Sequence, residues 1–184
     1  MDSDIFIHNG TLLTMEAGLP VIENGFVHIK QGKIADCGPA VPGRPKNRVP
    51  KGARQIDAWG GIIMPGLVNG HTHTPMSMFR GLADDLPLDV WLNEHIFPAE
   101  ARDINPESVA QWTAHSCREM LAGGITTCCD GYFLESHAAK AMADTGIRAV
   151  AGQGVIDFPA PGVPDPFDNI GHAKEFIEKT STLS

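Results

Sequence analysis

Cysteine is one of the scarcer residues in this 184-residue sequence, which contains four of them. They are Cys37, Cys117, Cys128 and Cys129, and no two of them have the Cys-x-x-Cys spacing. Without such a pair the sequence predicts neither a zinc ribbon nor a framework of disulfide bonds. Free cysteines suit a reducing compartment such as the cytosol.

Basic residues and long apolar runs are also few. Lysine and arginine number 14 against 22 aspartate and glutamate residues, and the formal net charge is -8 at pH 7. This charge argues against a nucleic-acid partner. No apolar run approaches the roughly 18 residues that would cross a bilayer, and the N-terminus lacks the basic and apolar segments of a secretory signal. We therefore expect a cytoplasmic protein with no membrane partner, and whether it forms a homo-oligomer is left open.

The pattern of apolar runs and turn residues changes near Pro65. Short strands separated by turns, such as Asn9-Gly10 and Gln31-Gly32, fill residues 1–65. Beyond them, apolar β-rich runs alternate with segments of helical periodicity. The alternation indicates βαβ units on a parallel sheet, with three such units in residues 66–184. The predicted strands are 62–68, 125–130 and 147–150, and the predicted helices are 106–123, 136–144 and 169–179.

Two histidines, His71 and His73, follow the first of these apolar strands. Side chains two apart on a strand point to the same side, so both imidazoles would face one space. In a parallel α/β barrel, active sites are built at the carboxyl ends of the strands. Two imidazoles there suit a divalent metal, zinc above all. The alternative is a pair of exposed loop histidines, but the position directly after IIMPGLVNG favours the metal site.

The run MPGLVNGHTH, from Met64 to His73, resembles the first barrel strand of the amidohydrolase superfamily. The segments Pro75–Leu88, Trp91-Leu92 and Pro98-Ala99-Glu100 resemble the branch of S-adenosylhomocysteine/methylthioadenosine deaminases, which is close to the triazine hydrolases. The resemblance extends over nearly the whole chain.

The resemblance implies an α/β fold, namely an incomplete (β/α)8 TIM-like barrel preceded by a small β-sandwich domain. Residues 1–65 would be the N-terminal part of the sandwich, and residues 66–184 would be the first three βα units of the barrel. The implied reaction is the metal-dependent hydrolytic deamination of an adenosine-type nucleoside, such as methylthioadenosine or S-adenosylhomocysteine. The substrate is thus a small molecule, and the cofactor is a divalent metal, zinc with iron as the second candidate.

The resemblance also assigns roles to particular residues. His71 and His73 stand where the family has metal ligands, Glu100 where it has a glutamate that binds the ribose hydroxyls, and Trp91 where an aromatic residue lines the same pocket. From the residues alone, Glu100 could equally be a solvated acid near a helix start, and Trp91 a core residue. Gln153 stands where members that accept S-adenosylhomocysteine can have an arginine, so recognition of a substrate carboxylate is left open.

A complete (β/α)8 barrel takes about 250 residues. The resemblance therefore places the remaining metal ligands and the catalytic acid and base beyond Ser184, and we expect this chain alone to be inactive. Two alternatives remain. One is an aminohydrolase or chlorohydrolase that acts on a triazine, guanine or another heterocycle, and the other is a non-catalytic half-barrel that needs a partner chain.

Overall fold

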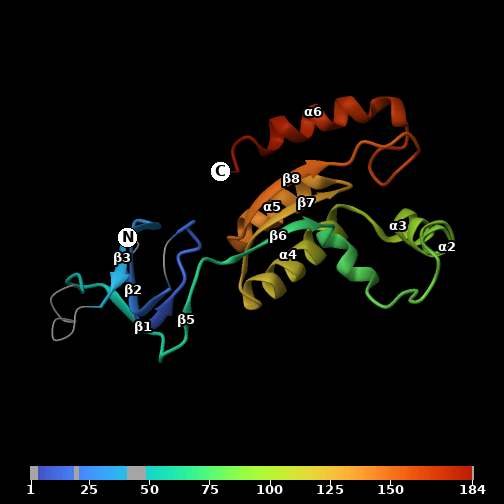
Figure 1. Cartoon of the computed structure of the whole chain (residues 1–184). Helices are drawn as coiled ribbons and strands as arrows, with labels where there is room; N and C mark the ends of the chain where they lie inside the picture. Colours follow the sequence, from blue (N-terminus) through green and yellow to red (C-terminus); the bar gives the residue numbers. More distant parts are fainter. Residues whose placement is uncertain (1–3, 19–20, 41–48, 184) are drawn as a thin grey trace. The chain divides into compact units, whose positions relative to one another are not determined.

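The computed structural model describes residues 4–18, 21–40 and 49–183 (Figure 1). The chain forms two compact units, Met1–Pro65 and Gly66–Ser184. In the described part of the first unit the regular elements are strands, whereas the second unit combines strands with helices. Among the described residues, no helix combines the length and the apolar character needed to cross a membrane.

The first unit is a sheet of five strands. They are β1 (Ile5–Leu12), β2 (Ile22–Lys30), β3 (Lys33–Pro39), β4 (Arg54–Asp57) and β5 (Ile62–Ile63). The strand order is β3-β2-β1-β4, and β5 pairs with the last residues of β1. β2 runs antiparallel to β1 and β3, whereas β4 and β5 run parallel to β1.

Both faces of this sheet bury apolar side chains. Phe26 and Val27 are neighbours on β2 and so point to opposite faces, yet both are buried. Phe26 stacks on Phe6 with ring centroids 5.3 Å apart, and Val27 packs with Leu12 and Ile63. Each face of this sheet therefore has a buried apolar side chain in its centre.

The two turns predicted in this unit have different outcomes. Gln31-Gly32 does connect β2 to β3, and both residues have positive φ (51° and 72°), as a two-residue hairpin turn requires. The turn predicted at Asn9-Gly10 is wrong, because β1 continues through it. Asn9 has a φ of 60°, and the pairing of β1 with β2 shifts register there, so the pair forms an irregularity inside one strand.

The second unit contains a parallel sheet in the order β6-β7-β8. The strands are β6 (Leu67–Thr72), β7 (Ile125–Tyr132) and β8 (Arg148–Gln153). The predicted strand 62–68 is thus divided between the two units, with Pro65 and Gly66 between the parts. A side chain at Gly66 would collide with Thr126, so glycine lets β6 start close against β7.

Helical segments connect these strands, as the predicted βαβ pattern requires (Figure 1). Between β6 and β7 lie η1 (Thr74–Phe79), α2 (Leu88–Val90), η2 (Trp91–Ile96), α3 (Phe97–Asp103) and α4 (Pro106–Ala122). α5 (Glu135–Thr145) joins β7 to β8, and η3 (Pro166–Asp168) and α6 (Asn169–Thr180) follow β8.

Helix α4 agrees closely with the predicted helix 106–123, because local signals define both of its ends. Asn105 and Ser108 form a capping box at the N-terminus, and Gly123 is the C-cap. The buried residues of the helix recur at helical spacing along one face. They are Val109, Thr113, Cys117 and Met120.

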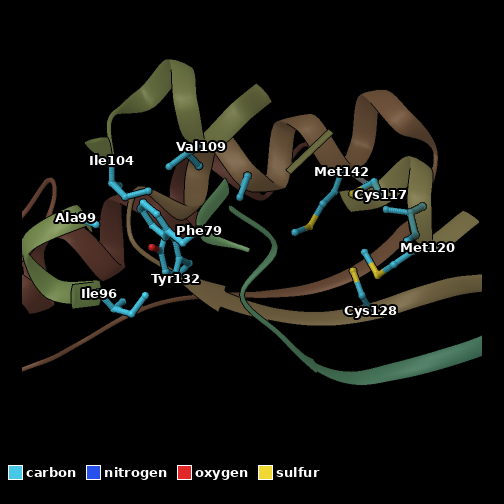
Figure 2. Packing of buried hydrophobic residues seen from close by; sticks show 12 residues of the cluster. Phe79, Ile96, Ala99, Ile104, Val109, Cys117, Met120, Cys128, Tyr132 and Met142 are labelled. Atoms are coloured by element: carbon cyan, nitrogen blue, oxygen red, sulfur yellow. The ribbon is translucent and has the colours of Figure 1, made fainter. Parts of the chain in front are cut away.

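The core of the second unit lies where α4 and α5 cover one face of the sheet (Figure 2). β7 contributes Cys128 and Tyr132, and the helices contribute most of the remaining side chains. Cys117 and Cys128 are fully buried here and pack as small apolar side chains, whereas Cys129 is only partly buried. The whole cluster is Phe79, Ile96, Ala99, Ile104, Val109, Cys117, Met120, Cys128, Tyr132, Ala138, Met142 and Ile147.

The opposite face of this sheet carries exposed apolar side chains. Val68 pairs with Thr127 and Val150 pairs with Cys129, so both valines point away from the face of Cys128. Their exposed fractions are 65% and 66%. Parallel sheets normally have both faces covered, so this uncovered face distinguishes the unit from a complete α/β layer.

Asn105→Ala should lower the free energy of unfolding by about 1 kcal/mol. The side-chain oxygen of Asn105 accepts from the backbone N–H groups of Glu107 (3.1 Å) and Ser108 (3.0 Å), and alanine leaves both groups without this partner. Urea unfolding should show a lower midpoint at an unchanged slope. Asn105→Asp retains the acceptor and is the control. Equal unfolding free energies for the alanine variant and the wild type would contradict the capping role.

Candidate metal and substrate site

The two histidines lie together at the carboxyl end of β6, as expected for residues two apart. Their Nε2 atoms are 3.3 Å apart, and their rings meet edge to face at an interplanar angle of 80°. Both side chains are exposed. The exposed pair is therefore open to a ligand that both rings could share.

His73 is oriented by the neighbouring strand. Its Nδ1 lies 2.5 Å from the main-chain oxygen of Gly131 on β7. A carbonyl oxygen only accepts hydrogen bonds, so the proton of the neutral ring is on Nδ1 and Nε2 presents a lone pair. Metal-binding histidines commonly have this arrangement, in which the other ring nitrogen donates to a carbonyl or carboxylate.

The spacing of the pair fits one metal ion between the rings. Two nitrogen ligands of a tetrahedral zinc, each about 2.0–2.1 Å from the metal, lie about 3.3 Å apart. This matches the 3.3 Å between the Nε2 atoms of His71 and His73. Within residues 4–18, 21–40 and 49–183, no group of three or more His, Cys, Asp or Glu side chains could hold a metal. The pair offers two ligands, and further ligands would have to come from elsewhere.

Asp130, at the end of β7, holds the chain on both sides of His73. Its Oδ1 accepts from the hydroxyl of Thr72 (2.5 Å) and from the backbone N–H of Thr74 (2.8 Å). Its Oδ2 accepts from the hydroxyl of Thr74 (2.8 Å), which also lies 3.2 Å from the hydroxyl of Thr113 on α4. The Asp130 carboxylate is buried, so these hydrogen bonds have little competition from water and hold the end of β6 in one geometry.

The sequence interpretation gave Asp130 no role in the site. A signal was present, since an acid ends β7 and two threonines flank His73. Only the register of two strands that are distant in sequence brings these groups together.

Glu100 is buried on α3 and hydrogen-bonded to the end of β7. The hydroxyl of Tyr132 donates to its Oε1 at 2.5 Å, and the residue is 5% exposed. Burial raises the pKa of the Glu100 carboxyl above its ordinary value, although the Tyr132 hydroxyl and the nearby His73 act in the opposite direction. The alternative of a solvated surface glutamate is therefore wrong.

Tyr132 remains a hydrogen-bond donor under all ordinary conditions. Burial, followed by the hydrogen bond to Glu100, raises the pKa of its phenol far above the usual range. The phenol therefore keeps its proton and holds one oxygen of Glu100, which leaves the other oxygen for a ligand.

Trp91 begins η2 and is partly buried. Its side chain packs against the core cluster of the second unit, as the core-packing alternative requires. It does not belong to the residues that line the cavity beside Glu100. A contact between Trp91 and a substrate stays a prediction.

Gln153 ends β8 and pairs with Tyr132 in the strand ladder. Its Oε1 accepts from the backbone N–H of Glu135 (3.1 Å), and its Nε2 donates to the main-chain oxygen of Gly154 (3.3 Å). Leu134, the N-cap of α5, has a positive φ and supplies no side-chain cap. The amide of Gln153 therefore satisfies an N–H of this helix end.

A cavity of about 380 Å³ lies beside Glu100. Its walls come from α3, from the turn between β7 and α5, and from the loop after β8. Among these described lining residues Glu100 is the one that ionises, and aromatic and proline side chains dominate the rest. The lining residues are Phe97, Glu100, Ala101, Phe133, Phe158, Pro159, Ala160 and Pro161.

Glu135 is a further buried acid that the sequence interpretation missed. It lies in the first turn of α5 with no exposed surface, and among the described residues neither carboxyl oxygen has a hydrogen-bond partner. Burial, with the charge of Asp130 as a second cause, raises its pKa to about 9. Glu135 is therefore uncharged at neutral pH, which avoids the cost of an unpaired buried charge.

The amidohydrolase family matches residues 62–183 of the chain. The chain therefore belongs to this family, which confirms the resemblance of the segment around His71 and His73. The mixed α/β fold likewise matches solved amidohydrolase deaminases.

Individual relatives cover most of this chain. A 5-methylthioadenosine/S-adenosylhomocysteine deaminase from Thermodesulfovibrio yellowstonii is 46% identical over 171 residues, which are 91% of this chain and 38% of the relative. A 5'-deoxyadenosine deaminase from Methanococcoides burtonii is 43% identical over 155 residues, 84% of this chain and 34% of the relative.

Among solved structures, a zinc-bound adenosine deaminase from Xanthomonas campestris matches with a TM-score of 0.81 and 34% identity. The match covers 98% of this chain and 40% of that protein. The chain thus spans well under half the length of these relatives.

The stability of the wild-type protein should decrease as pH rises from about 4.5 to 9, and Glu135→Gln should remove this decrease. The carboxyl has a pKa of about 9 in the folded state against an ordinary 4.5, so between these values the folded state holds a proton that the unfolded state has lost. Stability from this group is therefore complete below pH 4.5 and is lost as pH rises towards 9, by about 1.4 kcal/mol per pH unit. Thermal unfolding between pH 5 and 9 should give a flatter curve for the glutamine variant.

Glu107→Gln is the control for this experiment, since Glu107 is an exposed acid in the first turn of α4. It should leave the pH dependence as in the wild type. A Glu135→Gln curve parallel to the wild-type curve would mean that Glu135 finds a partner in solution.

Proposed function

We propose that the chain is the N-terminal part of a metal-dependent hydrolase that removes the amino group of an adenosine-type nucleoside. One juxtaposition at the end of β7 carries the proposal. Gly131 orients His73, and the next residue, Tyr132, holds Glu100. The rings of His73 and Tyr132 lie 6.2 Å apart. A metal and a hydroxyl-binding carboxylate would thus act on one small substrate, and the relatives named as adenosine-type deaminases support this.

For the fold, we propose that residues 66–184 are the first three βα units of a (β/α)8 barrel. The exposed Val68 and Val150 support this, because closing the barrel would cover the face on which they lie. Residues 1–65 would be the N-terminal part of a β-sandwich, which the five-stranded sheet of this unit and its buried apolar cluster support.

For the metal, we propose that His71 and His73 are two of its ligands, with zinc as the ion and iron as the second candidate. The 3.3 Å spacing of the Nε2 atoms and the donor on His73 Nδ1 support this assignment. When bound, such an ion would supply an activated water for hydrolysis of the C–N bond at neutral pH. Asp130 and its two threonines would keep the ligands in place.

For the substrate, we propose that Glu100 binds the ribose. Tyr132 occupies Oε1, so Oε2 is the oxygen that would accept from the adjacent hydroxyls of a ribose. These donors would stabilise the ionised carboxylate and offset its burial. Trp91 would contribute by packing beneath the site, and Gln153 by fixing the start of α5.

The proposed location is the cytoplasm, on the strength of the cysteines, all four of which are free. The acidic balance favours a small-molecule substrate over a nucleic acid.

Ammonia release from adenine nucleosides by the full-length enzyme tests the function. Activity on guanine or triazines alone would favour the heterocycle alternative, and activity that requires a second polypeptide would favour the half-barrel alternative.

His71→Ala and His73→Ala should each lower the zinc content of the full-length enzyme and abolish turnover, because each removes one of the proposed ligands. Metal content is measured by elemental analysis on the folded variants. His137→Ala, at an exposed histidine of α5, is the matched control and should retain the metal. Full metal occupancy in the double variant would contradict the assignment of His71 and His73 as metal ligands.

Glu100→Gln should raise KM for nucleosides and reduce kcat/KM about tenfold to a hundredfold, as expected for weakened hydrogen bonds to a charged acceptor. Tyr132→Phe should also raise KM, but less. It leaves the Glu100 carboxylate in place and removes only the hydrogen bond that holds its Oε1. The two effects should be non-additive in the double variant. Adenine, which lacks the ribose, is the control substrate. An equal loss of kcat/KM for adenine would show that Glu100 does not bind the ribose.

A further inference from the structure

The cavity beside Glu100 bears on which nucleoside the enzyme prefers, an inference that rests on the proposed function. Methylthioadenosine and S-adenosylhomocysteine share adenine, ribose and a 5' sulfur. They differ in what the sulfur carries, which is a methyl group in one and a charged amino acid in the other. If Glu100 binds the ribose hydroxyls, the sugar ring lies beside the space that Glu100 borders. That space is the 380 Å³ cavity.

The lining of this cavity is apolar. Three phenylalanines, Phe97, Phe133 and Phe158, surround it together with Pro159 and Pro161. Aromatic rings make favourable contacts with a thioether sulfur. The cavity has room for either substituent, so its chemistry and not its size has to distinguish them.

Charge in and around the cavity disfavours a carboxylate. No lysine, arginine or histidine belongs to the described residues that line it. The loop 154–168 that forms one wall contains three aspartates and no basic residue. A carboxylate placed there would lose its hydration without gaining a cationic partner, and it would face the acid Glu100.

Polar groups at the end of β8 and on α6 are directed elsewhere. Gln153 uses its amide on the N–H of Glu135 and on the main-chain oxygen of Gly154. With His172 and Lys179 it lines a separate cavity of about 180 Å³, which shares no lining residue with the first. None of these three groups therefore borders the cavity of Glu100.

The wall formed by the loop is held in place before any ligand binds. Phe158 contacts Phe97 of α3 with ring centroids 5.7 Å apart. Ala160 and Val163 exchange two backbone hydrogen bonds, of 3.0 and 2.9 Å, across a turn in which Gly162 has a φ of 79°. A proline followed by a glycine of positive φ is typical of a type II turn. The apolar surface is therefore preformed, and a charged substituent could not easily displace it.

We propose that this cavity is the subsite for the 5' substituent, and that it accepts an uncharged thioether or alkyl group in preference to a charged amino acid. The enzyme would thus be selective for methylthioadenosine-type nucleosides over S-adenosylhomocysteine.

The test compares kcat/KM for 5'-methylthioadenosine and S-adenosylhomocysteine in the full-length enzyme. We expect methylthioadenosine to be favoured at least about tenfold, the scale on which a pocket rejects an ill-matched group. Phe158→Arg adds a cation to the cavity wall at a side chain that is 43% exposed and does not belong to the buried core cluster. The variant should lower the ratio of kcat/KM for methylthioadenosine to kcat/KM for S-adenosylhomocysteine about tenfold, or reverse the preference.

Phe167→Arg is the matched control. It adds the same cation to a phenylalanine that is 94% exposed and lies outside the cavity lining, so it should leave the ratio unchanged. Equal use of the two substrates by the wild-type enzyme would overturn the inference, as would a Phe158→Arg variant that slows both equally. These results leave the proposed function intact, whereas failure to deaminate any adenine nucleoside would reject the function itself.

Discussion

Hydrogen bonds from three consecutive residues at the end of β7 hold the candidate site together. Asp130 binds the threonines on both sides of His73, the main-chain oxygen of Gly131 accepts from the ring of His73, and the hydroxyl of Tyr132 donates to Glu100. The parallel arrangement makes this possible, because it brings the carboxyl ends of neighbouring strands to one edge of the sheet. One strand end thereby sets the positions of both the proposed metal ligands and the proposed ribose-binding acid.

The site and the core of the second unit depend on the same packing. Tyr132 and Cys128 belong to the buried cluster beneath α4 and α5 (Figure 2). Asp130, also buried, lies between them in sequence on the same face of β7. The buried carboxylate of Asp130 accepts hydrogen bonds from several donors. Glu135, close by, has no donor among the described residues, and it stays uncharged because it keeps its proton. A substitution that loosens this core would therefore alter both the stability of the unit and the geometry of its polar groups.

The parts of the fold that depend on local signals were predictable. Helix α4 begins and ends close to its predicted limits because a capping box and a glycine pair mark its ends, and the alternation of strands and helices predicted the parallel sheet. The errors came where pairing partners decide the structure. Asn9-Gly10 has the residues of a turn but lies inside β1, which β2 holds on one side and β4 and β5 on the other. Residues 62–68 form a continuous apolar run, yet they divide between two sheets.

The sequence by itself determined the amidohydrolase membership, the order of strands and helices, and the pairing of His71 with His73, because each of these depends on neighbouring residues or on short motifs. Tertiary structure alone decided the partners of the other site residues. His73 meets Gly131 across 58 positions of the chain, and Glu100 meets Tyr132 across 32. It also buried Glu135 without a partner, directed Gln153 to the start of α5, and gave the cavity beside Glu100 its apolar wall. The physical reason is that burial and hydrogen-bond partners depend on which strands and helices become neighbours, and no short stretch of sequence records that.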